Sequence, residues 1–189
     1  MSDLIAFLRA RLDEDEAAAR AAVEPERPGI HWAWFDGETD EEVVPTLDRE
    51  YIDEESRVSL RTRERYPARM LLDNMLPAFP IPYGQEIRSG VAAHIARWDP
   101  ARVLAEVAAK RAVAALHTPC HVESDPWSCT SGHYGSRGIG LDGTQPARCG
   151  VCVESFLYEE TLPSPCPTLL ALVQPYAAHP DFDPAWRIS

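Results

Sequence analysis

The sequence predicts a mainly helical α+β fold with a small N-terminal β element and a C-terminal module that resembles a zinc knuckle. Three observations carry this expectation. Apolar residues recur at helical spacing in several segments, a short aromatic run precedes a turn signal, and all five cysteines lie between residues 117 and 166. With 189 residues, 45% of them hydrophobic, the chain is long enough for one core and a small metal-stapled module.

Two regions are expected. Residues 1–116 form an acidic α+β region, and residues 117–189 form a Cys/His-rich zinc module that ends in a helix. Residues 1–60 carry 17 acidic and six basic side chains, which is −11 of the total net charge of −12. An acidic surface repels phosphate, so the sequence argues against nucleic acid as a partner. It leaves a protein partner and the oligomeric state open.

A first helix is expected over residues 2–22. Ser2 is a favourable N-cap, and Leu4, Leu8 and Leu12 recur at the spacing of one helical face. Pro25 then ends the segment, because a proline disrupts a continuing helix.

Strands are expected within residues 31–61. The aromatic run of residues 31–35 is followed by Asp36-Gly37, a turn signal. Weaker strand patterns lie near residues 42–44 and 57–61. Four prolines between residues 62 and 86 interrupt any long element there.

Two helices are expected in the centre of the chain, over residues 86–97 and 100–116. Asp99 is a good N-cap for the second, and Pro100 fits the first helical position, where its missing N–H costs nothing. A last apolar helix begins near residue 167, and the aromatic side chains after it are spaced to pack on a surface groove.

The cysteines have the spacing of a metal site. Cys149-Gly150-Val151-Cys152 is a C-x-x-C pattern, in which two thiolates bind one zinc ion and a glycine suits a tight turn. Thirteen residues separate Cys152 from Cys166, which lies directly before the last helix. Residues 117–166 lack periodicity, so a bound zinc would supply folding free energy that the local side chains do not.

Tetrahedral zinc needs a fourth ligand. His117 is favoured because the end of a long helix is a firm platform for a ligand. Cys120 and Cys129 are the next candidates, and His121 and His133 remain in the set.

An enzyme is the alternative. His121-Val122-Glu123 resembles the H-x-E of zinc-dependent nucleobase deaminases, which is followed later by P-C-x-x-C, and 25 residues separate Glu123 from Cys149. There, the histidine and the two cysteines, here Cys149 and Cys152, would hold zinc while Glu123 shuttles protons. The context departs from that pattern, because Pro146 precedes the first cysteine by three residues and the pattern leaves Cys166 unexplained. The sequence therefore favours a non-enzymatic protein, with a zinc-dependent hydrolase or deaminase-like enzyme as the alternative.

Cellular location follows from two absences in the sequence. No apolar run approaches the roughly 20 residues needed to cross a bilayer. The first residues lack the basic region and cleavage site of a signal peptide. We expect a cytoplasmic protein, away from membranes, in which thiols stay reduced.

Four pieces of the sequence resemble one family. They are the opening DLIAFL, the central HIARWDPARVL of residues 94–104, the CPTL of residues 166–169 and the ending PYAAHPDF with Trp186. In these pieces the chain resembles a family of unknown function among small proteins of actinobacteria and their phages. The resemblance implies an accessory protein of phage origin and says little about its activity.

Members of that family place a histidine after the central helix, then C-x-x-C, then a cysteine before the last helix. The resemblance thus implies His117, Cys149, Cys152 and Cys166 as zinc ligands. This sequence departs from the family by a long insert in residues 36–86 and by additional residues of ligand type. These are Cys120, His121, Cys129 and His133, and they leave the fourth ligand open.

Overall fold

The computed structural model describes residues 2–52, 57–67, 75–117, 148–155, 160–163 and 165–188, with backbone alone for residues 148–155 and 160–163. Contacts divide the chain into two units. Unit 1 comprises Met1–Glu14 and Ala108–Ser189, and unit 2 comprises Asp15–Val107. The sequence predicts two regions that divide after residue 116. The two units are defined by contacts alone, so the predicted division stays a prediction.

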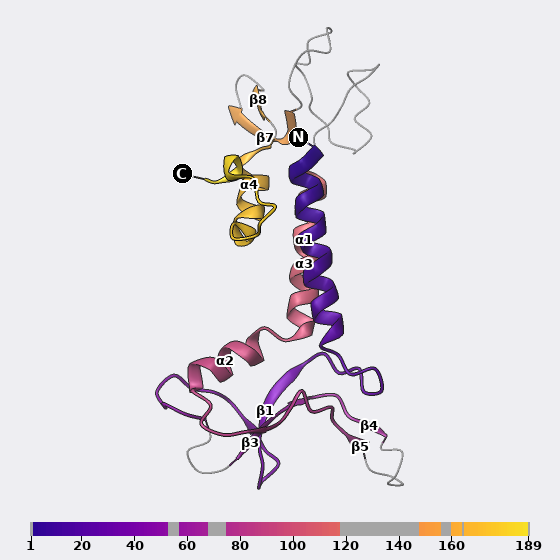
Figure 1. Cartoon of the computed structure of the whole chain (residues 1–189), viewed down its shortest axis with the longest axis vertical. Coiled ribbons are helices and arrows are strands. Elements are labelled where there is room, and N and C mark those ends of the chain that lie inside the picture. Colours follow the sequence, from indigo (N-terminus) through magenta and orange to yellow (C-terminus); the bar gives the residue numbers. More distant parts are fainter. Residues whose placement is uncertain are drawn as a thin grey trace. The chain divides into compact units, whose positions relative to one another are not determined.

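The described residues contain four α-helices (Figure 1). They are α1 (Ser2–Ala21), α2 (Ser89–Arg97), α3 (Pro100–Leu116) and α4 (Pro167–Val173), and the 3-10 turns Gln174–Tyr176 and Pro184–Trp186 follow α4. An α+β fold with mainly helical structure is therefore confirmed. α1, α3 and α4 match their predicted segments closely.

α2 begins three residues later than predicted. Glu86 has a φ of 56°, in the left-handed region, which a helix cannot use. The backbone on either side is bonded elsewhere, because Ile52 N–H donates to Ile87 O at 3.0 Å and Ser89 N–H donates to Glu50 O at 2.9 Å. These long-range hydrogen bonds hold the segment before residue 89 in an extended form.

The start of α3 follows the local sequence. Asp99 Oδ1 accepts a hydrogen bond from the backbone N–H of Arg102 at 2.8 Å, which is N-cap geometry. Its other oxygen, Oδ2, accepts from Trp32 N–H at 3.3 Å. The predicted cap is confirmed, and the same carboxylate also ties the start of α3 to the first strand.

Unit 2 contains an antiparallel sheet with the order β2-β1-β3-β6. Its strands are β1 (Trp32–Asp36), β2 (Glu42–Val43), β3 (Val58–Thr62) and β6 (Ile81–Gly84). β4 (Tyr66–Pro67) and β5 (Met75–Leu76) form a separate antiparallel pair. The sequence predicts β1, β2 and β3 within a residue or two, whereas β4, β5 and β6 lie in the proline-rich stretch that it leaves unassigned.

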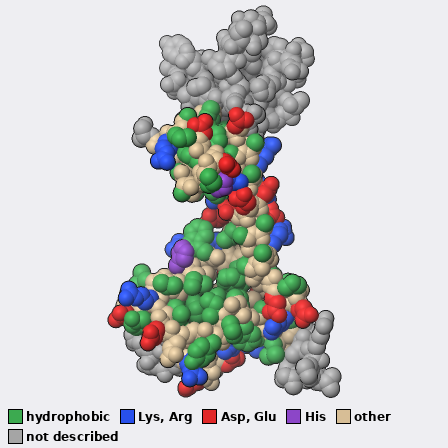
Figure 2. Space-filling view, viewed as in Figure 1, with side chains coloured by type: hydrophobic (Ala, Val, Ile, Leu, Met, Phe, Trp, Pro, Cys, Tyr) green, Lys and Arg blue, Asp and Glu red, His purple; other side chains and the backbone are tan. Residues whose placement is uncertain are grey.

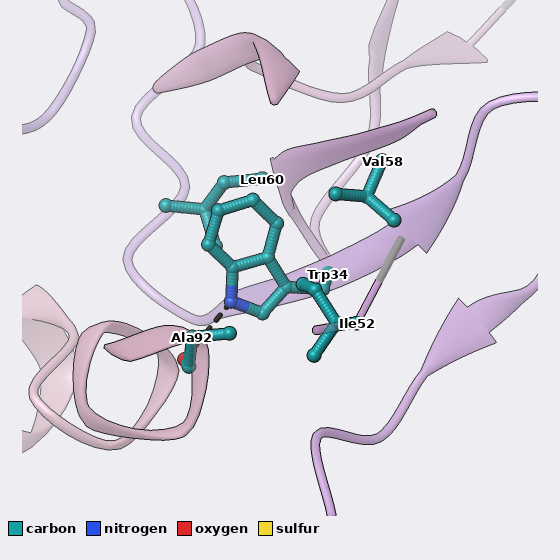
Figure 3. Packing of buried hydrophobic residues seen from close by; sticks show 5 residues of the cluster. All are labelled: Trp34, Ile52, Val58, Leu60 and Ala92. Carbon is teal, nitrogen blue, oxygen red and sulfur yellow. Dashed lines mark hydrogen bonds between the residues drawn. The ribbon is translucent and has the colours of Figure 1, made fainter. Parts of the chain in front are cut away.

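The core of unit 2 is built around Trp34 (Figure 3). Its side chain has no exposed surface and packs against Val58 and Leu60 of β3, Ile52, and Ala92 of α2. The indole Nε1–H donates to Ala92 O at 2.9 Å. Burial of the ring and satisfaction of its one donor together fix α2 against the sheet.

Unit 1 contains the first turns of α1, the last turns of α3 and the C-terminal segment. Leu4, Leu8 and Leu12 of the predicted stripe are all buried. Asp13 of α1 pairs with Arg111 of α3 at 2.5 Å, so these parts of the two helices lie side by side (Figure 1). The chain also places β7 (Arg148–Ser155) and β8 (Glu160–Pro163) in this unit as an antiparallel pair.

The aromatic tail packs onto α1. The Phe7 ring lies 6.4 Å from Tyr176, 5.9 Å from Phe182 and 5.1 Å from Trp186, measured between ring centroids. Arg11, one turn further along α1, places its guanidinium 5.1 Å from the Phe7 centroid. The expected packing of the tail on a surface is confirmed, and α1 supplies that surface.

Candidate metal centre

Two of the four predicted zinc ligands meet in unit 1. His117 Nδ1 lies 3.4 Å from Cys166 Sγ, although 49 positions separate these residues in the sequence. Cys166 has no exposed surface and His117 is 9% exposed. The sequence names both as ligands, and the fold brings them together in a buried place.

Local structure explains why each side chain is well positioned. The His117 N–H donates to both Val113 O and Ala114 O at 3.2 Å, so the residue continues the last turn of α3. Cys166 is the N-cap residue of α4, with extended backbone, and Pro167 occupies the first helical position. Two helix ends therefore present the imidazole and the thiol to each other.

The C-x-x-C motif lies in β7 and not in the tight turn that the sequence suggests. Its pairing with β8 is irregular at the motif. Arg148 pairs with Pro163 and Val153 pairs with Thr161, so five positions along β7 stand against two positions along β8. In a regular strand, residues three apart face opposite sides of the sheet. The pairing across residues 149–152 is therefore not that of a regular strand.

The other residues of ligand type lie outside the described residues. They are Cys120, His121, Glu123, Cys129 and His133. Among the side chains that the structure does describe, no three of the His, Cys, Asp or Glu type are grouped closely enough to hold a metal ion. The described pair, His117 and Cys166, is thus the part of the predicted centre whose geometry is known.

The structure also exposes a group of side chains that the sequence does not predict as a site. Val91 of α2 is 52% exposed, and Trp98, the C-cap residue of this helix, is 41% exposed. The signal that could have found them is their spacing of seven residues with His94 between them, which puts all three on one helical face.

The fold and the site define a small α+β protein with a buried histidine–cysteine pair at the junction of two helix ends. The sequence profile of a family of unknown function (DUF6221) matches residues 1–188, so the chain belongs to that family. This confirms the resemblance at the level of the family, whereas an actinobacterial or phage origin stays a prediction. No curated protein and no solved structure matches the chain.

A membrane span is absent from the helices that the structure describes. None of them combines the length and the apolar character that crossing a bilayer requires.

Proposed function

We propose that this chain is a non-enzymatic accessory or interaction protein whose C-terminal module is held by one structural zinc ion. The proposed ligands are His117, Cys149, Cys152 and Cys166. The observation that carries the proposal is the buried approach of His117 Nδ1 to Cys166 Sγ at 3.4 Å. The family itself has no known function, so the argument depends on this site.

The distance fits a shared tetrahedral ion. Zinc–nitrogen and zinc–sulfur bonds of about 2.0 and 2.3 Å at the tetrahedral angle place the two ligand atoms about 3.5 Å apart. A thiol that donates to an imidazole has a similar separation. The metal is favoured because Cys149 and Cys152 add two thiolates at the spacing that binds one ion, which a thiol–imidazole hydrogen bond alone leaves unexplained.

The ligand set argues for a structural role. Three cysteines and one histidine complete the coordination of zinc, whereas a catalytic zinc keeps one position open for water or substrate. The ligands also come from the end of α3, from β7 and from the start of α4. An ion that joins these three places would fix α3, β7 and α4 to one another. The proposal keeps the phage origin that the sequence resemblance implies.

A Cys166→Ser variant tests the ligand set. We expect about one zinc per purified wild-type chain and a loss of most of it in the variant after dialysis, because a hydroxyl is a poor zinc ligand. Elemental analysis measures the content. Cys129→Ser is the matched control, since Cys129 is a cysteine of the same segment outside the proposed set, and it should keep its zinc.

The same experiment separates the proposal from the deaminase-like alternative. In that alternative His121, Cys149 and Cys152 hold the metal, so Cys166→Ser would retain zinc and His121→Ala would lose it. That pattern, or metal-free wild-type protein from zinc-supplemented cells, would contradict the proposed centre.

A further inference from the structure

One side of α2 is exposed in the described part of the chain. Five exposed residues recur there at spacings of three and four and so share one helical face. They are Gly90, Val91, His94, Arg97 and Trp98, and we call them the α2 outer face. The buried side of the helix, which carries Ser89 and Ala92, points into unit 2.

The outer face exposes a large apolar surface. Val91 is 52% exposed and Trp98 is 41% exposed. In the space-filling view, further hydrophobic side chains gather on the visible face of unit 2 beside α2 (Figure 2). Adjacent exposed apolar groups of this size mark interaction sites more often than isolated ones do.

The tryptophan of this face is held in place. The guanidinium of Arg102 lies 4.6 Å from the Trp98 ring centroid, and the His94 ring centroid lies 6.2 Å from it. Cation–π contact restricts the ring before any partner arrives. Binding then costs less conformational entropy, and tryptophan is the residue most enriched among energetic anchors of interfaces.

The charge of α2 is opposite to that of the chain. Residues 87–98 contain Arg88 and Arg97 and no Asp or Glu, whereas the chain carries a net charge of −12. Both arginines are exposed, and neither forms an ion pair within the described part of the chain. In contrast, Arg63 and Arg102 of the same unit pair with Glu42 and Glu106. The guanidinium groups beside the apolar surface are therefore available to external carboxylates.

Among the described residues, no close contact and no backbone conformation requires a glycine at position 90. A Cβ added there would meet nothing within 4 Å, and its φ is not in the left-handed region. Glycine destabilises a helix relative to alanine. A glycine on an exposed helical face permits another backbone to approach closely, as small residues do where helices pack.

We propose that the α2 outer face binds a protein partner through a segment that combines an apolar side chain with acidic residues. The apolar side chain packs on Val91 and Trp98, the carboxylates pair with Arg97 and Arg88, and the partner's backbone passes over Gly90. Nucleic acid fits less well, because two arginines in a strongly acidic chain do not offset the repulsion of phosphates. The proposal deepens the interaction role proposed above and rests on it, while zinc binding is independent of it.

Selection from a random linear peptide library on the immobilised full-length chain tests this partner chemistry. We expect enriched peptides to combine Asp or Glu with an aromatic or aliphatic residue. Synthetic peptides of the enriched sequences should bind Trp98→Ala at least roughly tenfold more weakly than the wild type in titration calorimetry. Leu47→Ala is the matched control, because Leu47 is an apolar residue of unit 2 with 82% exposure, and it should leave the affinity unchanged.

Two further variants test the proposal if Trp98→Ala perturbs the fold. Arg97→Glu changes an exposed side chain and should shift the enriched peptides from acidic to basic. Gly90→Ala should raise the melting temperature of the free chain and weaken peptide binding at the same time. Zinc content measured on the same samples shows whether a loss of binding is separate from a failure of the metal centre.

Several outcomes would overturn the proposal. They include no enrichment over the blank support, peptides that bind Trp98→Ala and Arg97→Glu as tightly as the wild type, and binding of single-stranded DNA or anionic vesicles that depends on Arg97. Concentration-dependent dimerisation that is lost in Trp98→Ala would assign the face to a second copy of the chain instead.

Discussion

Asp99 is a buried carboxylate whose two oxygens have different tasks. One caps α3 and the other accepts the N–H of Trp32 in β1. A charge with so little exposure is stable only where hydrogen-bond donors surround it. The sequence identifies the first task from the Asp99-Pro100 pair and gives no sign of the second.

Replacing Asp99 should therefore destabilise the chain for two reasons, the loss of the helix cap and the loss of the acceptor for Trp32 N–H. We expect Asp99→Ala to lower the free energy of unfolding by about 1–2 kcal/mol, because it removes the cap and leaves Trp32 N–H without this acceptor. Asp99→Asn keeps one carbonyl oxygen for the cap and should lose less. Urea denaturation followed by circular dichroism measures both, and equal stability of Asp99→Ala and the wild type would contradict the assignment.

Glu64 links stability to pH. Burial raises the pKa of its carboxyl, but hydrogen bonds from the His31 side chain and from the backbone N–H groups of Glu64, Ile30 and His31 outweigh it, so the pKa lies below the ordinary value of 4.5. His31 Nδ1 lies 2.6 Å from Glu64 Oε1. A depressed folded-state pKa means that the ionised carboxylate is stabilised by the fold.

The sign of the effect follows from this pKa. The contribution of Glu64 is complete above pH 4.5 and disappears as the pH falls through the lower folded-state value. We expect wild type to be more stable than Glu64→Gln at pH 6 to 7 and this difference to vanish in acid. Denaturation curves across this range measure it, and a difference that does not depend on pH would count against the linkage.

At the scale of elements, local signals and long-range pairing explain what the sequence could predict. α3 lies where a cap, a proline and an apolar face coincide within 18 residues, from Asp99 to Leu116. β6 exists because β3 lies beside it, and its Ile81-Pro82-Tyr83-Gly84 sequence has little strand character of its own. The late start of α2 has the same cause, since hydrogen bonds to residues 50 and 52 decide it.

The cysteine motif likewise combines a local sequence signal with a feature that depends on long-range strand pairing. Spacing alone identifies Cys149 and Cys152 as a pair, because two thiolates three positions apart can bind one ion. Spacing does not reveal that the motif belongs to a strand, where regular geometry would separate the two side chains. The five-against-two register between β7 and β8 depends on the pairing of both segments.

At the scale of the whole molecule, the proposed zinc predicts unequal responses of the two units to metal removal. With a chelator present, we expect the amides of β7, β8 and α4 to exchange faster with solvent, because the ion would no longer join these elements. The amides of β1 and β3 should keep their protection, since Trp34 and Leu60 maintain their core.

Hydrogen–deuterium exchange with mass spectrometry, with and without chelator, measures this difference. The Cys166→Ser chain, which is expected to lack most of the zinc, serves as the control for damage from the chelator itself, because the chelator should change its exchange little further. Exchange that rises equally in both units, or in neither, would contradict a zinc that stabilises the C-terminal module.

The sequence by itself determined the positions of three helices, the cap at Asp99 and the acidic charge, and it supplied the residues proposed for a metal centre. These features depend on neighbours within a few positions or on composition. Only the tertiary structure decided that His117 meets Cys166, that β6 completes the sheet and that Trp98 stays exposed. Each of these depends on which distant segments pack together, and packing follows from the shape and burial of the whole unit, which no local pattern encodes.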